Sequence, residues 1–589
     1  MWCGVQLALA LLAAAAGAGA APEVLLPGLG AARGSSTASR WRRRPVFQFQ
    51  GLPFARPPTG RLRFKPPEPP VPWDGVLDAT KFNRKCPTSL VDSTYDVLDV
   101  NDTGHPEDCL HINVYTPSLN TSGSGLPVMV FFHGGSFRVG SARDFRPEFL
   151  LDRDILLVVP QYRLGPLGFL CLQTEDVPGN VGLLDHISAL RWVQSYIHHF
   201  GGDPGSVTVF GQSAGGASVT LLMVSPLVEQ GLFSRVIAQS GSAYGTWVMD
   251  PEPVEHARSI ATLANCSQQN LTELASCLRE VDTHDLLNAH SSFLYRDLKS
   301  GGRGTGGNHV VVQEESVGAR SRFLVEQPAV SFAQGRFHRV PLMGGVTKHE
   351  GSFILGNIYD IILQTRKLTH DFEYLSRNLT RDTLRFGGIE DATGMVEQVL
   401  VQKYFHNGEL GYFDKMTPGL VDICGVALLK ASTFRMVQEN SRARPSYMYS
   451  FNYHGRHTMF GYGEEVDYPF PGGVAHSDDL IYLFPHDDKN LSGPELAVAR
   501  TMVQLWTNFA ATGSPAPAEG VPAWPPIADQ KGPYLRIDAA SAVGENFLDE
   551  YLAASLQGLA YSSSSSSAAP YSSVAALVAL VVSCGVALV

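Results

Sequence analysis

A serine lies at the centre of the motif in this sequence that has the clearest chemical meaning. Gly211-Gln212-Ser213-Ala214-Gly215 fits the pattern G-x-S-x-G, in which a sharp turn exposes a nucleophilic hydroxyl. A Val-rich run, residues 207–210, precedes the motif, and residues 217–223 after it can form a helix. The motif requires this order of strand, turn and helix, with glycines where no side chain fits. The sequence therefore predicts that Ser213 is the nucleophile of an acyl-transfer reaction.

Backbone donors for a developing oxyanion are available in a second glycine-containing segment. His133-Gly134-Gly135-Ser136-Phe137 directly follows the apolar run 126–132. Such a loop can direct successive N–H groups at one point, and the residue after the nucleophile adds another. We therefore expect the N–H groups of Gly135, Ser136 and Ala214 to form an oxyanion hole.

The elements that must position these motifs alternate between strand and helix. Residues 126–132 (LPVMVFF), 155–160 (ILLVVP) and 207–210 (VTVF) are continuous apolar runs, which is typical of strands covered on both faces. Residues 183–200 have apolar side chains at helical spacing. Strand, helix and strand in this order predict a βαβ unit in a parallel sheet.

A glycine-rich stretch, residues 301–307, interrupts the later part of the chain. Its composition predicts a mobile surface loop, and the alternative is that it forms the rim of an entrance.

The composition is that of a globular protein. The 589 residues are 44% hydrophobic and 17% charged, which gives the chain the apolar content that disordered chains lack. With 45 Lys+Arg against 56 Asp+Glu, the net charge is −11. An acidic chain is not expected to bind nucleic acid, which requires a concentrated basic face. The short basic cluster at residues 40–44 is interpreted as a solvated turn.

Both ends of the chain resemble targeting signals. Residues 1–20 carry an apolar run and end in small residues, which predicts a secretory signal peptide cleaved after Ala20. At the other end, small residues 562–567, a polar spacer 568–573 and an uncharged apolar tail 574–589 predict a glycosylphosphatidylinositol (GPI) signal. A membrane-spanning tail is the alternative. We therefore expect an extracellular protein held on the outer leaflet of the membrane, or else secreted.

Cysteines and glycosylation sequons agree with secretion. Six of the eight cysteines lie outside the two terminal signals, and six cysteines allow fifteen pairings. Cys86 with Cys109, and Cys266 with Cys277, could each close a loop, whereas Cys171 is interpreted as a small buried hydrophobic residue. Asn-x-Ser/Thr sequons predict surface positions. They occur at Asn101, Asn120, Asn265, Asn270, Asn378 and Asn490.

Taken together, these motifs closely resemble those of the type-B carboxylesterase and cholinesterase family of α/β-hydrolases. The resemblance covers residues 49–526 and includes the segments 49–55, 107–115, 163–165, 179–185 and 200–204 before the Ser213 motif, and 506–510 after it. It implies an α/β-hydrolase fold, a mostly parallel sheet flanked by helices with large loop insertions. The expected organisation is a signal peptide (1–20), one such domain (21–561), and a Ser-rich tract with the anchor signal (562–589).

The resemblance also implies the partners of Ser213. Residues 345–352 (GVTKHEGS) are similar to the family's acid segment and place the carboxylate at Glu350. Residues 474–480 (VAHSDDL) are similar to its histidine segment and place the base at His476. His349 for the base, and Asp478 or Asp479 for the acid, are the alternative assignments.

Further implications come from the same resemblance. It implies disulfides Cys86–Cys109 and Cys266–Cys277. Ser240 matches a serine that supports the triad, and Trp247 falls where the family has an aromatic residue of the acyl pocket, with a packed core tryptophan as the alternative.

Three departures from the family pattern bear on specificity. Ser136 stands where Gly or Ala is usual, and Gln212 stands where Glu is commoner. Residues 87–108 contain no Trp, whereas cholinesterases have one here that contacts quaternary ammonium.

The expected function is hydrolysis of carboxylic esters of small molecules through an acyl-enzyme on Ser213, a mechanism that needs no metal or cofactor. A non-catalytic cell-surface adhesion or receptor protein is the alternative from another class. A cholinesterase is the alternative among enzymes.

Overall fold

The structure is a computed structural model that describes residues 21–88, 104–120, 122–300, 302–463 and 468–559. Its centre is a sheet of eleven strands among the described residues, in the order β14-β13-β12-β11-β10-β9-β7-β8-β6-β4-β3. These strands are β3 (Ser35–Ala38), β4 (Pro45–Pro53), β6 (His111–Thr116), β7 (Leu126–Phe132), β8 (Leu156–Pro160), β9 (Gly202–Gln212), β10 (Arg235–Gln239), β11 (Leu342–Thr347), β12 (Ser446–Phe451), β13 (Tyr534–Ile537) and β14 (Ala542–Gly544). A smaller sheet holds β1 (Glu23–Leu26), β2 (Gly30–Arg33) and β5 (Val76–Asp78).

The centre of the large sheet is parallel. The neighbouring strands from β8 through β7, β9, β10, β11 and β12 to β13 pair in parallel, whereas β6, β4 and β3 at one edge and β14 at the other pair antiparallel. The predicted strands at 126–132, 155–160 and 207–210 correspond to β7, β8 and the end of β9, and α3 (Val181–Tyr196) lies between β8 and β9 in the chain. The predicted βαβ unit is confirmed.

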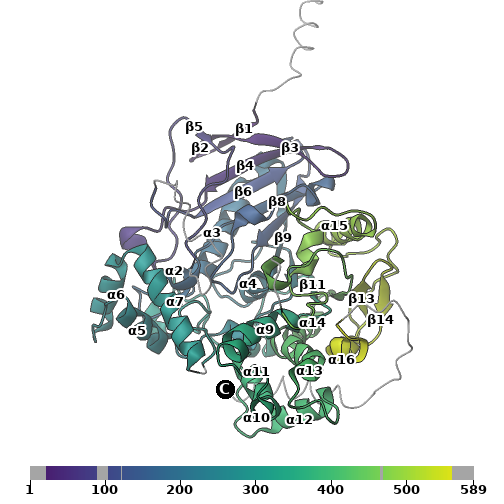
Figure 1. Ribbon diagram of the computed structural model, residues 1–589. Coiled ribbons are helices and arrows are strands. Elements are labelled where there is room, and N and C mark those ends of the chain that lie inside the picture. The colour runs from purple at the N-terminus through teal and green to yellow at the C-terminus, as the bar shows by residue number, and fades with distance from the viewer. Residues whose placement is uncertain (1–20, 89–103, 121, 301, 464–467, 560–589) are drawn as a thin grey trace, which may run out of the picture.

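Side chains alternate between the two faces of the sheet and belong to separate cores. On β7, Val128 and Val130 join the cluster that contains side chains of α3 and α4 (Ala214–Leu222). Met129 and Phe131 join the cluster that contains Trp506 of α15 (Pro494–Thr512). Figure 1 shows helices on both sides of the sheet. Burial on both faces explains why these strands are continuous apolar runs.

The segments inserted between strands of the sheet are largely helical. In chain order, one group of helices lies between β10 and β11 and another between β11 and β12. The first group is α5 (Pro253–Leu263), α6 (Leu271–Glu280), α7 (Thr283–Lys299) and α8 (Pro328–Ala333), and the second is α9 (Gly351–Ile358), α10 (Phe372–Arg377), α11 (Leu379–Phe386), α12 (Met395–Tyr404), α13 (Phe413–Gly425) and α14 (Ala431–Ser441).

The glycine-rich segment after α7 is only partly a surface loop. Gly306 and Gly307 are buried. The carbonyl of Gly306 lies 2.9 Å from Nε2 of His290, and the N–H of Gly307 donates to Oδ2 of Asp250 at 3.1 Å. The expectation of a surface loop is therefore wrong for these two glycines, because polar groups of the interior bind their backbone.

Among the described residues there are two disulfides, Cys86–Cys109 and Cys266–Cys277, as the resemblance implies. Cys171 and Cys424 are free and buried, and burial raises the pKa of the Cys171 thiol to about 12.

Four of the sequon asparagines are exposed and Asn378 is half-buried, whereas Asn101 lies outside the described residues. The exposed four are Asn120, Asn265, Asn270 and Asn490.

The predicted terminal signals, residues 1–20 and 562–589, both lie outside the described residues. Within the part of the chain that the structure describes, no helix combines the length and apolar character needed to cross a membrane.

Candidate active site

Ser213 occupies a sharp turn between β9 and α4. Its backbone has φ 58° and ψ −122°, a conformation that non-glycine residues rarely adopt and that is typical of strained functional sites. The turn is tight because α4 begins at Ala214, three residues earlier than the sequence predicts. A side chain on Gly215 would collide with the carbonyl of Phe132, and one on Gly211 would collide with the backbone of Gly215. The turn therefore has no room for a side chain at Gly211 or Gly215, as the motif predicts.

His476 and Glu350 meet behind this turn. Nδ1 of His476 lies 2.6 Å from Oε2 of Glu350, and the two side chains are 6% and 0% exposed. Oε1 of Glu350 accepts hydrogen bonds from the hydroxyl of Ser240 and, at 2.7 Å, from the N–H of Thr347. Burial alone raises the pKa of the Glu350 carboxyl, but His476 and the hydrogen bond from Ser240 contribute to holding it below its ordinary value. Glu350 is therefore held ionised beside the imidazole.

The residues of the alternative assignments, His349, Asp478 and Asp479, form hydrogen bonds with other groups. Nδ1 of His349 accepts from the N–H of Val474 at 3.0 Å. Oδ2 of Asp478 accepts from the N–H of Ala475 at 2.8 Å, and Oδ2 of Asp479 accepts from Nε2 of Gln239 at 2.8 Å. None of the three is hydrogen-bonded to His476 within the described residues, so Glu350 is the carboxylate that orients this imidazole.

The second ring nitrogen of His476, Nε2, faces Gln212. Nε2 of His476 lies 3.1 Å from Nε2 of the Gln212 amide. With the proton of His476 on Nδ1 toward Glu350, Nε2 accepts this hydrogen bond. In the described part of the chain no hydrogen bond joins His476 to Ser213, although both line the same cavity. Such contacts are often long without substrate and shorten in the substrate complex.

The predicted oxyanion loop lies against the turn at Ser213. A Cβ on Gly134 would lie 2.6 Å from the carbonyl oxygen of Gln212 and 2.9 Å from Cβ of Ser213. Gly135 and Ser136 both have positive φ, 107° and 54°. Neither of their N–H groups donates to another described residue.

The third predicted donor lies at the start of α4. Ala214 is the first residue of this helix, so its N–H has no acceptor within the helix. All three predicted donors are therefore available to a ligand.

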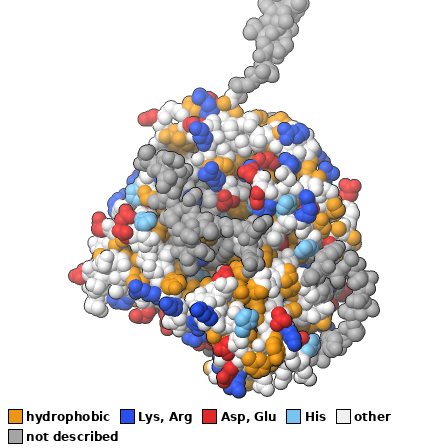
Figure 2. All heavy atoms as spheres, in the orientation of Figure 1, with side chains coloured by type: hydrophobic (Ala, Val, Ile, Leu, Met, Phe, Trp, Pro, Cys, Tyr) orange, Lys and Arg blue, Asp and Glu red, His pale blue; other side chains and the backbone are white. Residues whose placement is uncertain are grey.

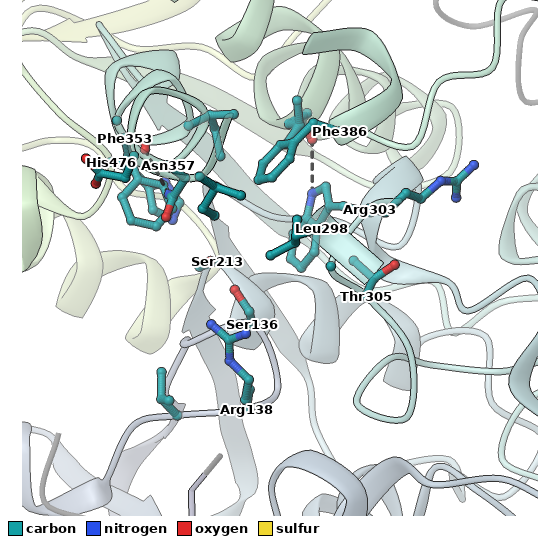
Figure 3. Close-up of a pocket in the computed structure, with 18 of the residues that line it drawn as sticks. Ser136, Arg138, Ser213, Leu298, Arg303, Thr305, Phe353, Asn357, Phe386 and His476 are labelled. Atoms are coloured by element: carbon teal, nitrogen blue, oxygen red, sulfur yellow. Dashed lines mark hydrogen bonds between the residues drawn. The ribbon is translucent and has the colours of Figure 1, made fainter. Parts of the chain in front are cut away.

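A cavity of about 530 Å³ opens at these residues and is lined by Ser136, Ser213, Trp247 and His476 among others. Figure 3 shows Ser136 and Ser213 on one wall and His476 beside Phe353 on another. The Trp247 indole donates to the carbonyl of Leu428 at 3.1 Å. The cavity is large enough for a small-molecule substrate.

Two parts of this site could not be identified from the sequence motifs. Phe353 of α9 stacks on the ring of His476 with centroids 5.2 Å apart. Nδ2 of Asn308 donates to the carbonyl of Ser136 at 3.0 Å and so ties the glycine-rich segment to the oxyanion loop. The only signal for Asn308 in the sequence is its position directly after that segment.

Comparisons with known proteins found a matching family model and related esterases. A family model described as the carboxylesterase family matches residues 20–554. Juvenile hormone esterase of Tribolium castaneum is 33% identical over 499 residues, which cover 81% of this chain and 82% of that protein. Carboxylesterase 1F of Mus musculus is 31% identical over 535 residues, which cover 88% and 90%.

A solved structure has the same architecture. The crystal structure of juvenile hormone esterase from Manduca sexta, with OTFP covalently attached, superposes with a TM-score of 0.74 at 25% identity. The alignment covers 90% of this chain and 98% of that chain. The predicted α/β-hydrolase fold is thereby confirmed.

Proposed function

The chain belongs to the carboxylesterase family and hydrolyses carboxylic esters, and on this premise we propose that Ser213, Glu350 and His476 are its catalytic triad. The observation that carries the proposal is the 2.6 Å contact between Nδ1 of His476 and Glu350, buried beside the strained turn of Ser213. A base oriented by a carboxylate is what a serine nucleophile needs for activation.

In the first half of the reaction, Oγ of Ser213 attacks the carbonyl carbon of the ester while Nε2 of His476 takes its proton. The carboxylate of Glu350 stabilises the imidazolium that forms. Since Nε2 lies 3.1 Å from the Gln212 amide, this amide must give up its hydrogen bond as the base turns to Ser213. The tetrahedral intermediate collapses, and His476 protonates the departing alcohol.

In the second half, water attacks the acyl group on Ser213 and His476 accepts a proton from this water. The acid leaves as Ser213 recovers its proton from His476. The N–H groups of Gly135, Ser136 and Ala214 would bind the oxyanion in both halves. Removing one such donor typically costs about 10²- to 10³-fold in turnover. Trp247 would contact the acyl group, and Ser240 would position Glu350.

Hydrolysis by residues 21–561 is tested with a series of p-nitrophenyl esters of increasing acyl length. We expect release of p-nitrophenol with a preference for one range of acyl length, because the cavity of about 530 Å³ limits the acyl group. A folded protein that hydrolyses none of them would contradict the proposal. That result would favour the adhesion or receptor alternative, and a selective preference for choline esters would favour the cholinesterase alternative.

The site of action is proposed to be the cell surface. The terminal sequences support a signal peptide (1–20), a single catalytic domain (21–561) and a lipid-anchor signal (562–589), and four exposed sequon asparagines are compatible with glycosylation. Phosphoinositide-specific phospholipase C should release the protein from the surface of expressing cells, because it cleaves such an anchor. Retention after treatment, with a known GPI-anchored protein released in parallel, would instead support a membrane-spanning tail.

A further inference from the structure

Basic side chains are concentrated along one part of the cavity. Among its described lining residues are four cationic side chains and one carboxylate, although the chain has a net charge of −11. The cationic residues are Arg138, Lys299, Arg303 and Arg366, and the carboxylate is Asp360. Figure 2 shows Lys and Arg side chains on the surface around α7, the helix that ends at Lys299. The charge at this cavity is therefore opposite to that of the whole molecule.

The basic wall, defined here as Lys299, Arg303 and Arg366, is a built part of the fold. Nη2 of Arg366 donates to the carbonyl of Lys299 at 3.2 Å, which fixes it at the end of α7. Asp297 binds the backbone of the following loop, since the N–H of Gly304 donates to its Oδ2 at 2.7 Å. Lys299 and Arg303, four residues apart in the sequence, and Arg366 from a separate segment are thus held at one rim.

The positive charges of Lys299 and Arg303 are weakly compensated by the described residues. Lys299 is exposed and forms no ion pair within 4.0 Å in that part of the chain. Its Nζ lies 5.9 Å from the ring centre of Tyr295. Arg303 is 3.3 Å from Glu390, whose side chain is 78% exposed, so solvent screens this pair.

Among the described residues, one ring nitrogen in the interior of the same cavity has no hydrogen-bond partner. His309 is 4% exposed and lines the cavity, and its Nδ1 has no hydrogen-bond partner within the described residues. Burial, the largest effect, lowers the pKa of His309 to about 4, so its imidazole is neutral near pH 7. The Nδ1 of a neutral imidazole can donate a hydrogen bond to a polar substrate or accept one from it, depending on the tautomer.

We propose that the cavity selects esters that carry an anionic group, such as a carboxylate, away from the ester bond. This inference rests on the proposed function, because Ser213 must be the nucleophile for charge at the rim of its cavity to affect hydrolysis. The cations would attract the anionic group as the substrate enters, and His309 would bind a polar atom of the substrate within. Electrostatic attraction of this kind raises association rates by about 10- to 10³-fold and weakens with salt.

The test compares pairs of esters in which a neutral end group is replaced by a carboxylate. On the acyl side, mono-p-nitrophenyl adipate is compared with p-nitrophenyl hexanoate. On the alcohol side, 4-acetoxybenzoate is compared with its methyl ester. We expect kcat/KM to be about fivefold or more higher for the anionic member of at least one pair, and the ratio to fall toward one as salt is added.

A variant that lacks two of these charges tests whether the basic wall causes the preference for anionic esters. Lys299→Gln combined with Arg303→Gln should lower the anionic-to-neutral ratio by about threefold or more. Lys415→Gln is the matched control, because Nζ of Lys415 also lies over a tyrosine ring, 4.6 Å from the centre of Tyr412, but does not line the cavity. The control should leave the ratio unchanged.

The outcomes separate the two proposals. Hydrolysis of the neutral esters without any preference for the anionic ones overturns this inference and leaves the proposed function standing. The same is true if the double variant lowers both rates equally, because the residues then act only on structure. Hydrolysis of neither kind by a folded protein overturns the proposed function and this inference together.

Discussion

Replacing Ser213 by alanine is expected to abolish ester hydrolysis and to leave the fold intact. Without Oγ no acyl-enzyme can form, and loss of the nucleophile from such a triad typically lowers kcat by about 10⁶-fold. The hydroxyl of Ser213 makes no hydrogen bond to His476 among the described residues, and alanine keeps the Cβ of the strained turn. The measurement is kcat with a p-nitrophenyl ester, together with the thermal midpoint of unfolding.

A neighbouring serine provides the control. Ser218 is buried one turn further along α4, and its hydroxyl donates to the carbonyl of Ala214 at 2.8 Å. Ser218→Ala removes a hydroxyl from the same helix without touching the nucleophile, so it should retain most of the activity. Comparable turnover in Ser213→Ala and wild type would refute the assignment of Ser213.

Replacing Glu350 by glutamine is expected to lower kcat by about 10⁴-fold. The amide has nearly the shape of the carboxylate, but it has no charge to stabilise the imidazolium. It can also present a donor to Nδ1 of His476, which then favours the tautomer with its proton on Nε2. In that tautomer Nε2 cannot accept the proton of Ser213. KM should change much less than kcat, because Glu350 is buried behind His476.

Asp479 is the matched control for Glu350. It is equally buried, at 0% exposure, but its hydrogen bonds are to Gln239 and to Tyr449 rather than to His476. Asp479→Asn should therefore have a smaller effect on kcat than Glu350→Gln at similar thermal stability. If Asp479→Asn abolished turnover while Glu350→Gln remained active, the acid of the triad would have to be reassigned.

The nucleophile turn could be predicted from the sequence because everything that defines it is local. Gly211, Ser213 and Gly215 lie within five residues, and the strand and helix on either side adjoin them. Burial of β7 and β8 on both faces explains why continuous apolar runs identified these strands almost to the residue.

The acid and the base could not be found from spacing. Glu350 and His476 are 126 residues apart in the chain yet meet at 2.6 Å. They were identified through the family resemblance alone. The structure supplies the physical reason: β9, β10 and β11 are adjacent in the sheet, so the segments after these strands carry Ser213, Ser240 and Glu350 to the same edge.

The wall of the cavity was not predictable either. Residues 301–307 were expected to form a surface loop or the rim of an entrance, but Asp250 and His290 bind Gly307 and Gly306 from the interior. These contacts join segments that no local pattern connects. The contact of Gln212 was not predictable either. In the sequence Gln212 is only an unusual residue at its position, whereas in the structure its amide lies against Nε2 of His476.

The most direct test of the account is to find where an acyl-transfer reagent reacts. The protein, as residues 21–561, is incubated with a fluorophosphonate, digested and analysed by mass spectrometry. The account predicts a phosphonyl group on Ser213, formed with loss of fluoride, and loss of ester hydrolysis in proportion to labelling. Hydrolysis that continues while Ser213 is fully labelled, or inactivation with the label on another residue, would contradict it.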